Sequence, residues 1–307
     1  MNLLSAIDIG TNTIRMLVAS RGPGSLRPVE RMRRITGMGK ELRDTGNIGK
    51  KEFAESISAL RELRRRMDAL GVVHYRACGT AALREAANRD AFLAAAAAAG
   101  VTVEIITADE EAMRTWDGIS GRIRDAGKTV VMDIGGGSTE FIAGPGKGRS
   151  VSLPIGVVVA CSLFRISDPP ENWQIRNMRL FFSERIRAGT ASWERRRFRR
   201  LVGTAGTFTT LAALEQRMKV YRPENIDGFS MSVERLRYWE DRLGRMREKD
   251  RLRLPGMEKG REKYIVPGVC QAVSAMERFG IGKLTVSDAG LLEGILLGLG
   301  AGKGEKG

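Results

Sequence analysis

The chain has 307 residues, of which 42% are hydrophobic and 28% charged, a composition that excludes disordered and fibrous proteins and fits one or two folded domains. Lys and Arg outnumber Asp and Glu by 51 to 36, which gives a formal net charge of +15. This charge favours a polyanionic partner and leaves nucleic acid, an anionic membrane surface and a polyphosphorylated small molecule as alternatives.

Three residue types exclude further classes of site. Cys78, Cys161 and Cys270 lie far apart without a C-x-x-C pair, so we expect neither disulfides nor a zinc site and place the chain in the reducing cytoplasm. The single histidine, His74, lies in an apolar strand pattern, where we expect a core or rim position, and histidine catalysis elsewhere in the chain is excluded. Aromatic residues are only 6% of the chain and rarely alternate with basic ones, which weakens the nucleic-acid alternative.

Apolar, β-branched segments alternate with amphipathic ones along the chain. Strands are predicted at 3–9, 14–19, 72–77, 101–106, 129–134 and 199–202. Helices are predicted at 50–70, 80–99, from 107, 156–165, 169–188, 206–218, 232–247, 260–279 and 289–299. The apolar end of the chain is shorter than the ~20 residues of a membrane span. The alternation predicts an α/β fold without a membrane-spanning segment.

Two pairs of similar segments indicate an internal duplication. IDIGTNTIRMLVA at 7–19 is repeated as MDIGGGSTEFIAG at 132–144, with Asp8 and Asp133 125 positions apart. A weaker pair begins at residues 76 and 200, with Gly79 and Gly203 124 positions apart. Two repeats at nearly one displacement predict two similar domains, which we place at 1–124 and 125–300, followed by a flexible tail at 301–307.

The first pair of segments predicts two β-hairpins with glycine turns. Backbone N–H groups and hydroxyls at such a turn can bind phosphate, and Asp8 and Asp133 are the oxygen ligands that Mg²⁺ prefers. A plain hairpin turn explains one copy equally well, but the matched second copy favours a function. The phosphate-binding residues that we expect are Gly10, Thr11, Asn12, Thr13, Gly135, Gly136, Gly137, Ser138 and Thr139.

An ordered set of segments resembles one enzyme family. The segments are 6–19, 79–93, 103–112, 130–144, 153–158, 202–214 and 286–296. Together they resemble the exopolyphosphatase and guanosine pentaphosphate phosphohydrolase family, within the acetate kinase, sugar kinase, Hsp70 and actin superfamily. The resemblance implies two ribonuclease-H-like (actin-like ATPase) domains with a cleft between them. It also implies Mg²⁺-dependent hydrolysis of a terminal phosphoryl group, in a short, two-domain form of the family.

The resemblance assigns roles to carboxylates. Glu110 matches the catalytic base that positions and deprotonates water, with Glu111 as the alternative in register. Acids in the first helical turn are also favoured by the helix dipole, so a structural role is the alternative. Asp133 and Glu140 match metal-binding carboxylates, with Asp8 as a third candidate, and a charge at the start of an apolar strand supports a ligand role for Glu140.

The resemblance also assigns two arginines to catalysis through contacts with phosphate. Arg15 is a charge within an apolar strand, whereas Arg84 has a solvated helix face as its alternative role. The arginine-rich segments 61–66 and 193–200 are interpreted as solvated surface that attracts a polyanion.

The chain departs from the family pattern at two positions. Leu292 stands where the family commonly has arginine, and Ala205 where it commonly has glycine, while Thr204 and Thr207 remain. We expect Leu292→Arg to restore a phosphate contact and lower KM for polyphosphate; if Leu292 packs in the core, the same change destabilises the fold instead.

The sequence therefore predicts an exopolyphosphatase that uses Mg²⁺. Guanosine pentaphosphate is the alternative substrate; the high positive charge and the absence of an appended domain favour polyphosphate. An ATP-using kinase of the same superfamily and a catalytically weak binding protein for polyphosphate or an alarmone are the other hypotheses. Neither nucleic acid nor a membrane is an expected partner. The assembly that we expect is a homodimer.

Overall fold

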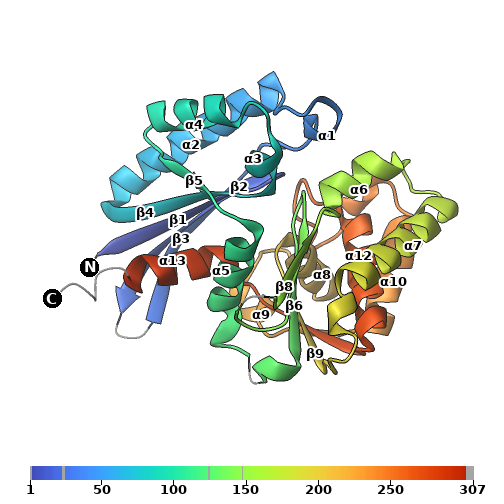
Figure 1. Cartoon of the computed structure of the whole chain (residues 1–307). Coiled ribbons are helices and arrows are strands. Elements are labelled where there is room, and N and C mark those ends of the chain that lie inside the picture. The colour runs from blue at the N-terminus through green and yellow to red at the C-terminus, as the bar shows by residue number, and fades with distance from the viewer. Residues whose placement is uncertain (1, 23–24, 124, 147, 302–307) are drawn as a thin grey trace. The chain divides into compact units, whose positions relative to one another are not determined.

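The computed structural model describes residues 2–22, 25–123, 125–146 and 148–301 and divides the chain into two units (Figure 1). Unit 1 comprises Met1–Gly121 and Gly290–Gly307, and unit 2 comprises Arg122–Ala289. The elements of unit 1 are β1 (Leu3–Ile9), β2 (Thr13–Gly22), β3 (Ser25–Ile35), α1 (Leu42–Thr45), α2 (Lys50–Leu70), β4 (Val72–Gly79), α3 (Ala81–Glu85), α4 (Arg89–Ala98), β5 (Val103–Ile105), α5 (Ala108–Ser120) and α13 (Leu291–Ala301).

Unit 2 contains the remaining elements. They are η1 (Ala126–Lys128), β6 (Thr129–Ile134), β7 (Thr139–Ile142), β8 (Ser150–Leu153), α6 (Val157–Phe164), α7 (Asn172–Gly189), η2 (Ala191–Trp193), β9 (Arg200–Thr204), α8 (Gly206–Glu215), α9 (Pro223–Ile226), β10 (Ser230–Ser232), α10 (Val233–Gly244), α11 (Glu248–Arg251), α12 (Ile265–Phe279) and β11 (Lys283–Val286). Two of the predicted helices are shorter than expected: the segment 80–99 is divided between α3 and α4, and 260–279 is helical only from Ile265.

The two sheets share one strand order. In the described residues, unit 1 has the order β3-β2-β1-β4-β5, and unit 2 has β8-β7-β6-β9-β11 with β10 added at the edge. In each unit the first three strands in chain order pair antiparallel. Two further strands then join in parallel, β4 and β5 in unit 1 and β9 and β11 in unit 2, while β10 pairs antiparallel with β11. This matched topology confirms the α/β fold with two ribonuclease-H-like units that the sequence predicts.

Side chains alternate between the two faces of the unit 1 sheet along each strand, and both faces are buried. On β1 and β2, one face carries Leu4, Ala6, Leu17 and Ala19, and the other carries Ile7, Ile9, Ile14, Met16 and Val18. The second face packs against α2 and α4. α2 presents its apolar residues at helical spacing and ends at Gly71, which adopts the left-handed conformation (φ 70°), as the sequence predicts.

The division of the chain differs from the expected boundaries at its C-terminal end. Helix α13 was expected in the second domain (125–300), but it packs against α5 and β1 of unit 1. The contact with α5 is close, because a Cβ added to Gly294 would lie 1.7 Å from the Arg114 carbonyl oxygen. Its apolar side chains, including Leu292 and Ile295, complete the cluster on the first face of the unit 1 sheet. The expected tail at 301–307 lies outside the described residues except for Ala301.

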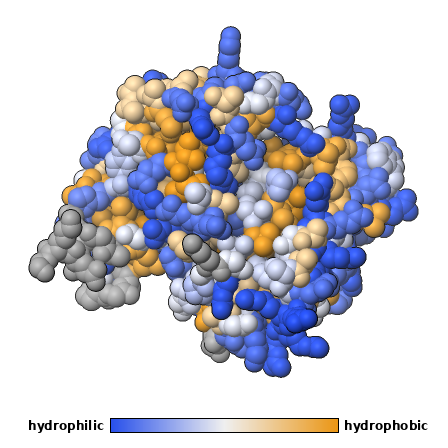
Figure 2. All heavy atoms as spheres, in the orientation of Figure 1, coloured by the Kyte–Doolittle hydropathy of each residue, from blue (hydrophilic) through white to orange (hydrophobic). Residues whose placement is uncertain are grey.

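The surface carries both hydrophilic and hydrophobic residues (Figure 2). Hydrophilic residues cover much of the face shown in Figure 2. Cys78, Cys161 and Cys270 are free thiols, and His74 is exposed on β4, at the rim rather than in the core. No helix in the described parts of the chain is long and apolar enough to cross a membrane.

Candidate functional site

The turn between β1 and β2 is fixed by backbone hydrogen bonds. The Gly10 N–H donates to the Thr13 carbonyl over 3.0 Å. Thr36 and Gly37 each donate an N–H to the Asn12 carbonyl over 3.1 Å. The Thr11 carbonyl accepts another such bond, from Gly39. Because these carbonyl oxygens are engaged within the protein, the N–H groups and the hydroxyls of the turn are the groups that it can offer an anion.

The turn between β6 and β7 repeats this arrangement. The Gly135 N–H donates to the Ser138 carbonyl over 3.0 Å, the counterpart of the bond from Gly10. The carbonyls of Gly136 and Gly137 accept bonds from Val158 and Gly156 at the start of α6, over 2.9 and 3.0 Å. A Cβ on Gly156 would lie 2.3 Å from the Gly136 carbonyl oxygen, so this approach requires glycine. The structure thus builds both predicted turns to one plan.

The first hairpin places Asp8 opposite Arg15. Arg15 Nε and Nη2 donate to Asp8 Oδ2 over 2.9 and 2.6 Å. The Asp8 side chain is 6% exposed, and that of Arg15 is 29% exposed. A guanidinium group therefore neutralises this carboxylate, which the sequence analysis offered as a third metal ligand.

The second hairpin places two acids at the equivalent positions. Asp133 lies opposite Glu140 in the β6–β7 register, so both side chains project from one face of the sheet. Glu140 is buried and accepts a 2.7 Å hydrogen bond from Ser152 Oγ on β8, while Asp133 is half-buried. Like charges on directly opposite residues destabilise a sheet unless a cation or a proton compensates them.

Glu110 lies in the first turn of α5. Thr107, two residues after the end of β5, caps the helix, its Oγ1 accepting the Glu110 N–H over 3.1 Å. The Glu110 carboxylate accepts a 2.9 Å hydrogen bond from Arg76 Nη2 on β4 and lies 3.7 Å from Arg114 Nε. Arg76 also binds Glu104. Burial lowers the pKa of Arg76, but its bonds to the two glutamates outweigh burial and raise it, so the guanidinium stays charged.

Glu111, the alternative base, has a different environment. Its Oε2 accepts a 2.8 Å hydrogen bond from Arg84 Nη1, which also donates to the Ile106 carbonyl over 3.0 Å. The Glu111 side chain is 13% exposed and that of Glu110 is 28% exposed. Water therefore has better access to Glu110. The structure brings Arg84, which the sequence analysis assigned to phosphate, onto a carboxylate at the same helix start.

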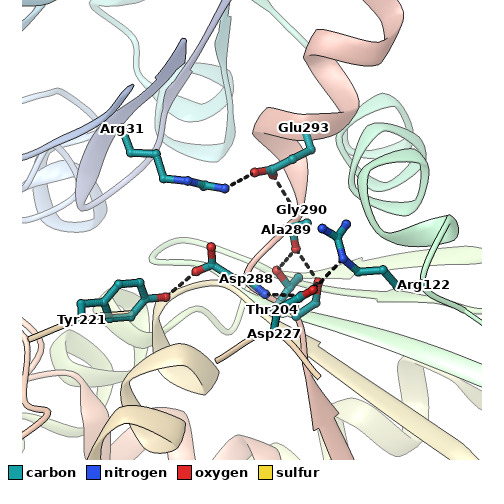
Figure 3. A network of polar contacts seen from close by, with 10 residues as sticks. Arg31, Arg122, Thr204, Tyr221, Asp227, Asp288, Ala289, Gly290 and Glu293 are labelled. Carbon is teal, nitrogen blue, oxygen red and sulfur yellow. Dashed lines mark hydrogen bonds and ion pairs between the residues drawn. The ribbon is translucent and has the colours of Figure 1, made fainter. Parts of the chain in front are cut away.

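The two departures from the family pattern now have structural accounts. Leu292 is 6% exposed and lies in the apolar cluster on the unit 1 sheet, which favours the second expected outcome, that arginine here destabilises the fold. The next residue, Glu293, accepts a hydrogen bond from Arg31 and one from the Gly290 N–H, each over 2.8 Å (Figure 3). Ala205 has φ 68° and ψ −176°, a conformation that favours glycine.

Polar contacts in unit 2 fix the residues at which the chain enters and leaves it. Arg122 Nε donates to Asp227 over 2.7 Å, and the same carboxylate accepts the Asp288 N–H over 3.1 Å. Thr204 Oγ1 donates to the Ala289 carbonyl over 2.8 Å (Figure 3). Thr204, noted in the sequence as a retained family residue, therefore anchors the last segment of unit 2.

Several residues of the candidate site were missed at the level of sequence. Arg76, Arg114 and Ser152 all contact predicted site carboxylates, and none was assigned a role. For Arg76 a signal was present, because it begins the second repeated segment and is a charge within a strand. For Arg114 the signal was the helical spacing of four residues from Glu110.

Comparisons with known proteins show similarity along nearly the whole chain. Residues 17–301 match the model of the Ppx/GppA phosphatase family. Exopolyphosphatase 2 from Mycobacterium tuberculosis is 35% identical and aligns with 96% of this chain and 98% of that protein. A guanosine-5′-triphosphate,3′-diphosphate pyrophosphatase from Aeromonas salmonicida is 26% identical and aligns with 97% of this chain but 59% of that protein.

Solved structures give the same result. An exopolyphosphatase from Cytophaga hutchinsonii matches with a TM-score of 0.90 at 25% identity, covering 98% of both chains. The Aquifex aeolicus member of the Ppx/GppA family matches with a TM-score of 0.80 at 29% identity, covering 99% of both chains. Since the family model and a relative at 35% identity both span nearly the whole sequence, the chain belongs to the Ppx/GppA phosphatase family.

Proposed function

We propose that the protein is an exopolyphosphatase, which removes the terminal phosphoryl group of inorganic polyphosphate. The observation that carries the proposal is the pair of glycine turns built to one plan, each with its carbonyl oxygens engaged within the protein. Such turns offer N–H donors to phosphate oxygens. The net charge of +15 suits a long polyanion, and the chain matches 98% of the length of a relative named for this activity.

Glu110 acts in this proposal as the general base. It accepts a proton from water while the water oxygen attacks the terminal phosphorus, and the bond from that phosphorus to the bridging oxygen breaks. Orthophosphate leaves, and the bridging oxygen remains on the shortened chain. Arg76 holds the Glu110 carboxylate in place through its 2.9 Å hydrogen bond. It acts as a positioning residue and does not contact the substrate.

Two arginines neutralise phosphate charge. Arg15 and Arg84 have side chains 29% and 22% exposed, and each is bound on one side by a carboxylate, Asp8 or Glu111. These contacts fix the guanidinium groups in advance, so the binding of an anion costs little further loss of side-chain freedom.

The residues of the second hairpin fit Mg²⁺. Among the described residues, no group of three or more His, Cys, Asp or Glu side chains is close enough to hold a metal ion by itself. Mg²⁺ is commonly held by one or two carboxylates together with water and substrate phosphate oxygens. Asp133 and Glu140, on opposite strands and on one face, are such a pair. When bound, the ion supplies positive charge that stabilises the charge developing on phosphate oxygens.

The same site also admits guanosine pentaphosphate as a substrate, and the relative named for a guanosine nucleotide supports this second candidate. This chain aligns with only 59% of that relative, which leaves part of that protein without a counterpart here. Polyphosphate is therefore the first proposal. A kinase and a weak binding protein remain as outcomes of the test.

The test is phosphate release in Mg²⁺ from long-chain polyphosphate, guanosine pentaphosphate and ATP, each at matched terminal-phosphate concentration. We expect polyphosphate to be hydrolysed fastest. Faster release from guanosine pentaphosphate would replace the first proposal by the second, and turnover that requires ATP and an acceptor would select a kinase. Tight binding of polyphosphate without release of phosphate would identify a binding protein.

A further inference from the structure

Unit 2 contains a pocket of about 470 Å³ that has no part in the proposed reaction. It lies between the C-terminal end of α8, helix α10 and the segment at 254–255, and we call it the α8–α10 pocket. Its polar lining includes Glu215, Arg217, Arg235, Tyr238 and Arg242. A volume in this range is typical of small-molecule sites.

The α8–α10 pocket is separate from the glycine turn of the same unit. Thr204, at the end of β9, is the parallel neighbour of Asp133, so α8 begins beside the sheet edge that carries the turn. The ten residues from Gly206 to Glu215 form a helix about 15 Å long. The pocket lies at the far end of that helix, on the order of 15 Å from the edge that carries the turn.

The lining carries excess positive charge. Glu215 accepts hydrogen bonds from Arg235 over 2.8 and 3.2 Å and from Trp239 over 2.6 Å. Burial raises the pKa of Glu215, but these bonds outweigh it and hold the pKa below its usual range. The charges of Glu215 and Arg235 thus cancel. In the part of the chain that the structure describes, no carboxylate forms an ion pair with Arg217 or Arg242, so two guanidinium groups remain for an anion.

Aromatic rings hold two of the guanidinium groups in place. Arg235 lies 4.2 Å from the centre of the Tyr238 ring, and Arg242 lies 5.2 Å from that of Trp239. Arg242 also donates to the Tyr238 hydroxyl over 3.0 Å. Trp239 is 4% exposed and belongs to the core, whereas Tyr238 is 43% exposed and offers a surface to a planar group.

We propose that the α8–α10 pocket binds a nucleotide, with its phosphates on Arg217 and Arg242 and its base on the planar surface of Tyr238 and Arg235. Phosphate matches the fork of a guanidinium group, and a base stacks on aromatic and guanidinium planes. The remaining lining includes Leu254 and Pro255, apolar groups that a bare polyphosphate chain would leave unused. The occupant is therefore a phosphorylated ring compound rather than inorganic polyphosphate.

The experiment is calorimetric titration with ADP and, separately, with inorganic tripolyphosphate. The test variant is Arg217→Gln with Arg242→Gln, and the matched control is Arg245→Gln, whose side chain is 75% exposed at the end of α10 and outside the pocket lining. We expect ADP to bind the unaltered protein and the control alike. The double variant should bind it about tenfold more weakly for each arginine, the usual effect of one charge-assisted contact.

Two further measurements distinguish this site from the glycine turns. Phosphate release from polyphosphate without nucleotide should be the same in all three proteins, because neither arginine belongs to the proposed reaction. Thermal melting checks that the double variant remains folded. Equal ADP affinity in the double variant and the control, or no ADP binding by the unaltered protein, would overturn the proposal. Tripolyphosphate that binds, at the site lost in the double variant, as tightly as ADP would also overturn it, because the base would then contribute nothing.

Discussion

The two hairpins have the same backbone but opposite electrostatics. Gly10 and Gly135 each donate to the residue three positions later over 3.0 Å, and each hairpin sets an aspartate opposite the residue seven positions on. In the first unit that residue is Arg15, and the pair is neutral. In the second it is Glu140, and the pair carries two negative charges when ionised. The two hairpins therefore share one backbone arrangement, but the residues opposite their aspartates have opposite charges.

In the proposed reaction, this difference gives the two hairpins different roles. A neutral pair beside a turn leaves its N–H groups and the arginine to bind phosphate oxygens. In the proposed reaction the acidic pair beside the equivalent turn holds a divalent cation, which offers charge to phosphate. The first unit also contains Glu110, the proposed general base.

The largest expected effect tests Glu110, the proposed base in the first unit. We expect Glu110→Gln to retain polyphosphate binding and to lose about 10²- to 10⁴-fold in kcat, because an amide cannot accept the proton of water. The measurement is phosphate release at saturating substrate, with binding followed separately by titration.

Two variants on the same helix serve as controls for Glu110. Asp117→Asn removes an exposed acid of α5 and should leave kcat within about twofold of the parent. Glu111→Gln removes the partner of Arg84 and should lower kcat less than Glu110→Gln. An inactive Glu111→Gln beside an active Glu110→Gln would show that the assignment is wrong by one residue.

The second effect concerns the face of the first hairpin that α13 covers. We expect Leu292→Arg to destabilise unit 1 by about 3 kcal/mol, because it places an unpaired guanidinium group in the cluster that contains Leu4 and Leu17. Leu292→Met, which conserves volume, should cost less than about 1.5 kcal/mol. Thermal melting of both variants is the measurement, and a parent-like melt of Leu292→Arg would contradict the burial of this position.

This case shows what the sequence could and could not predict. The family motif suggested arginine at 292, but the spacing of Leu292, Ile295 and Leu296 is that of an apolar helix face, and this spacing was the correct guide. The strands in the middle of each sheet were predicted because they are continuously apolar. The glycine turns that follow β1 and β6 were predicted as well. The placement of α13 in unit 1 depends on contacts with α5 and β1 that no local pattern contains.

Strand β3 was missed for a different reason. Its sequence, SLRPVERMRRI, is rich in charge, and the strand lies at the edge of the sheet, where charged residues protect against pairing with other chains. Glu30 and Arg34 form ion pairs with Arg66 and Glu62 of α2. The segment 61–66, interpreted as solvated surface, thus partly covers this edge strand. Arg76 and Glu110 are 34 positions apart, and their contact likewise depends on the fold.

The third effect tests the acidic pair directly. Asp133→Asn and Glu140→Gln should each raise the Mg²⁺ concentration for half-maximal rate by roughly tenfold or more, because each removes one anionic oxygen ligand. Asp8→Asn is the matched variant in the first hairpin, and it should leave this concentration unchanged, since Arg15 already neutralises Asp8. Phosphate release across a Mg²⁺ titration measures all three.

The outcome of that titration distinguishes the two hairpins. An effect of Asp8→Asn equal to that of Asp133→Asn would mean that both hairpins bind the metal and that the contrast between them is false. Unaltered Mg²⁺ dependence in Asp133→Asn and Glu140→Gln would mean that these carboxylates are structural.

The smallest expected effect compares two alanines at matched positions of the second repeat. Ala81 and Ala205 each follow a Gly-Thr pair, but Ala81 begins helix α3, whereas Ala205 has φ 68°.

The conformation of Ala205 costs about 1–3 kcal/mol for a residue with a Cβ, and glycine removes that strain at an entropic cost of about 0.4–1 kcal/mol. Ala205→Gly should therefore raise the melting temperature by about 2–4 °C. Ala81→Gly should lower it, because glycine disfavours a helix by about 0.5–1 kcal/mol relative to alanine. Calorimetric melts of the two variants measure this contrast, and equal shifts of the same sign would show that the two repeats share one backbone conformation here.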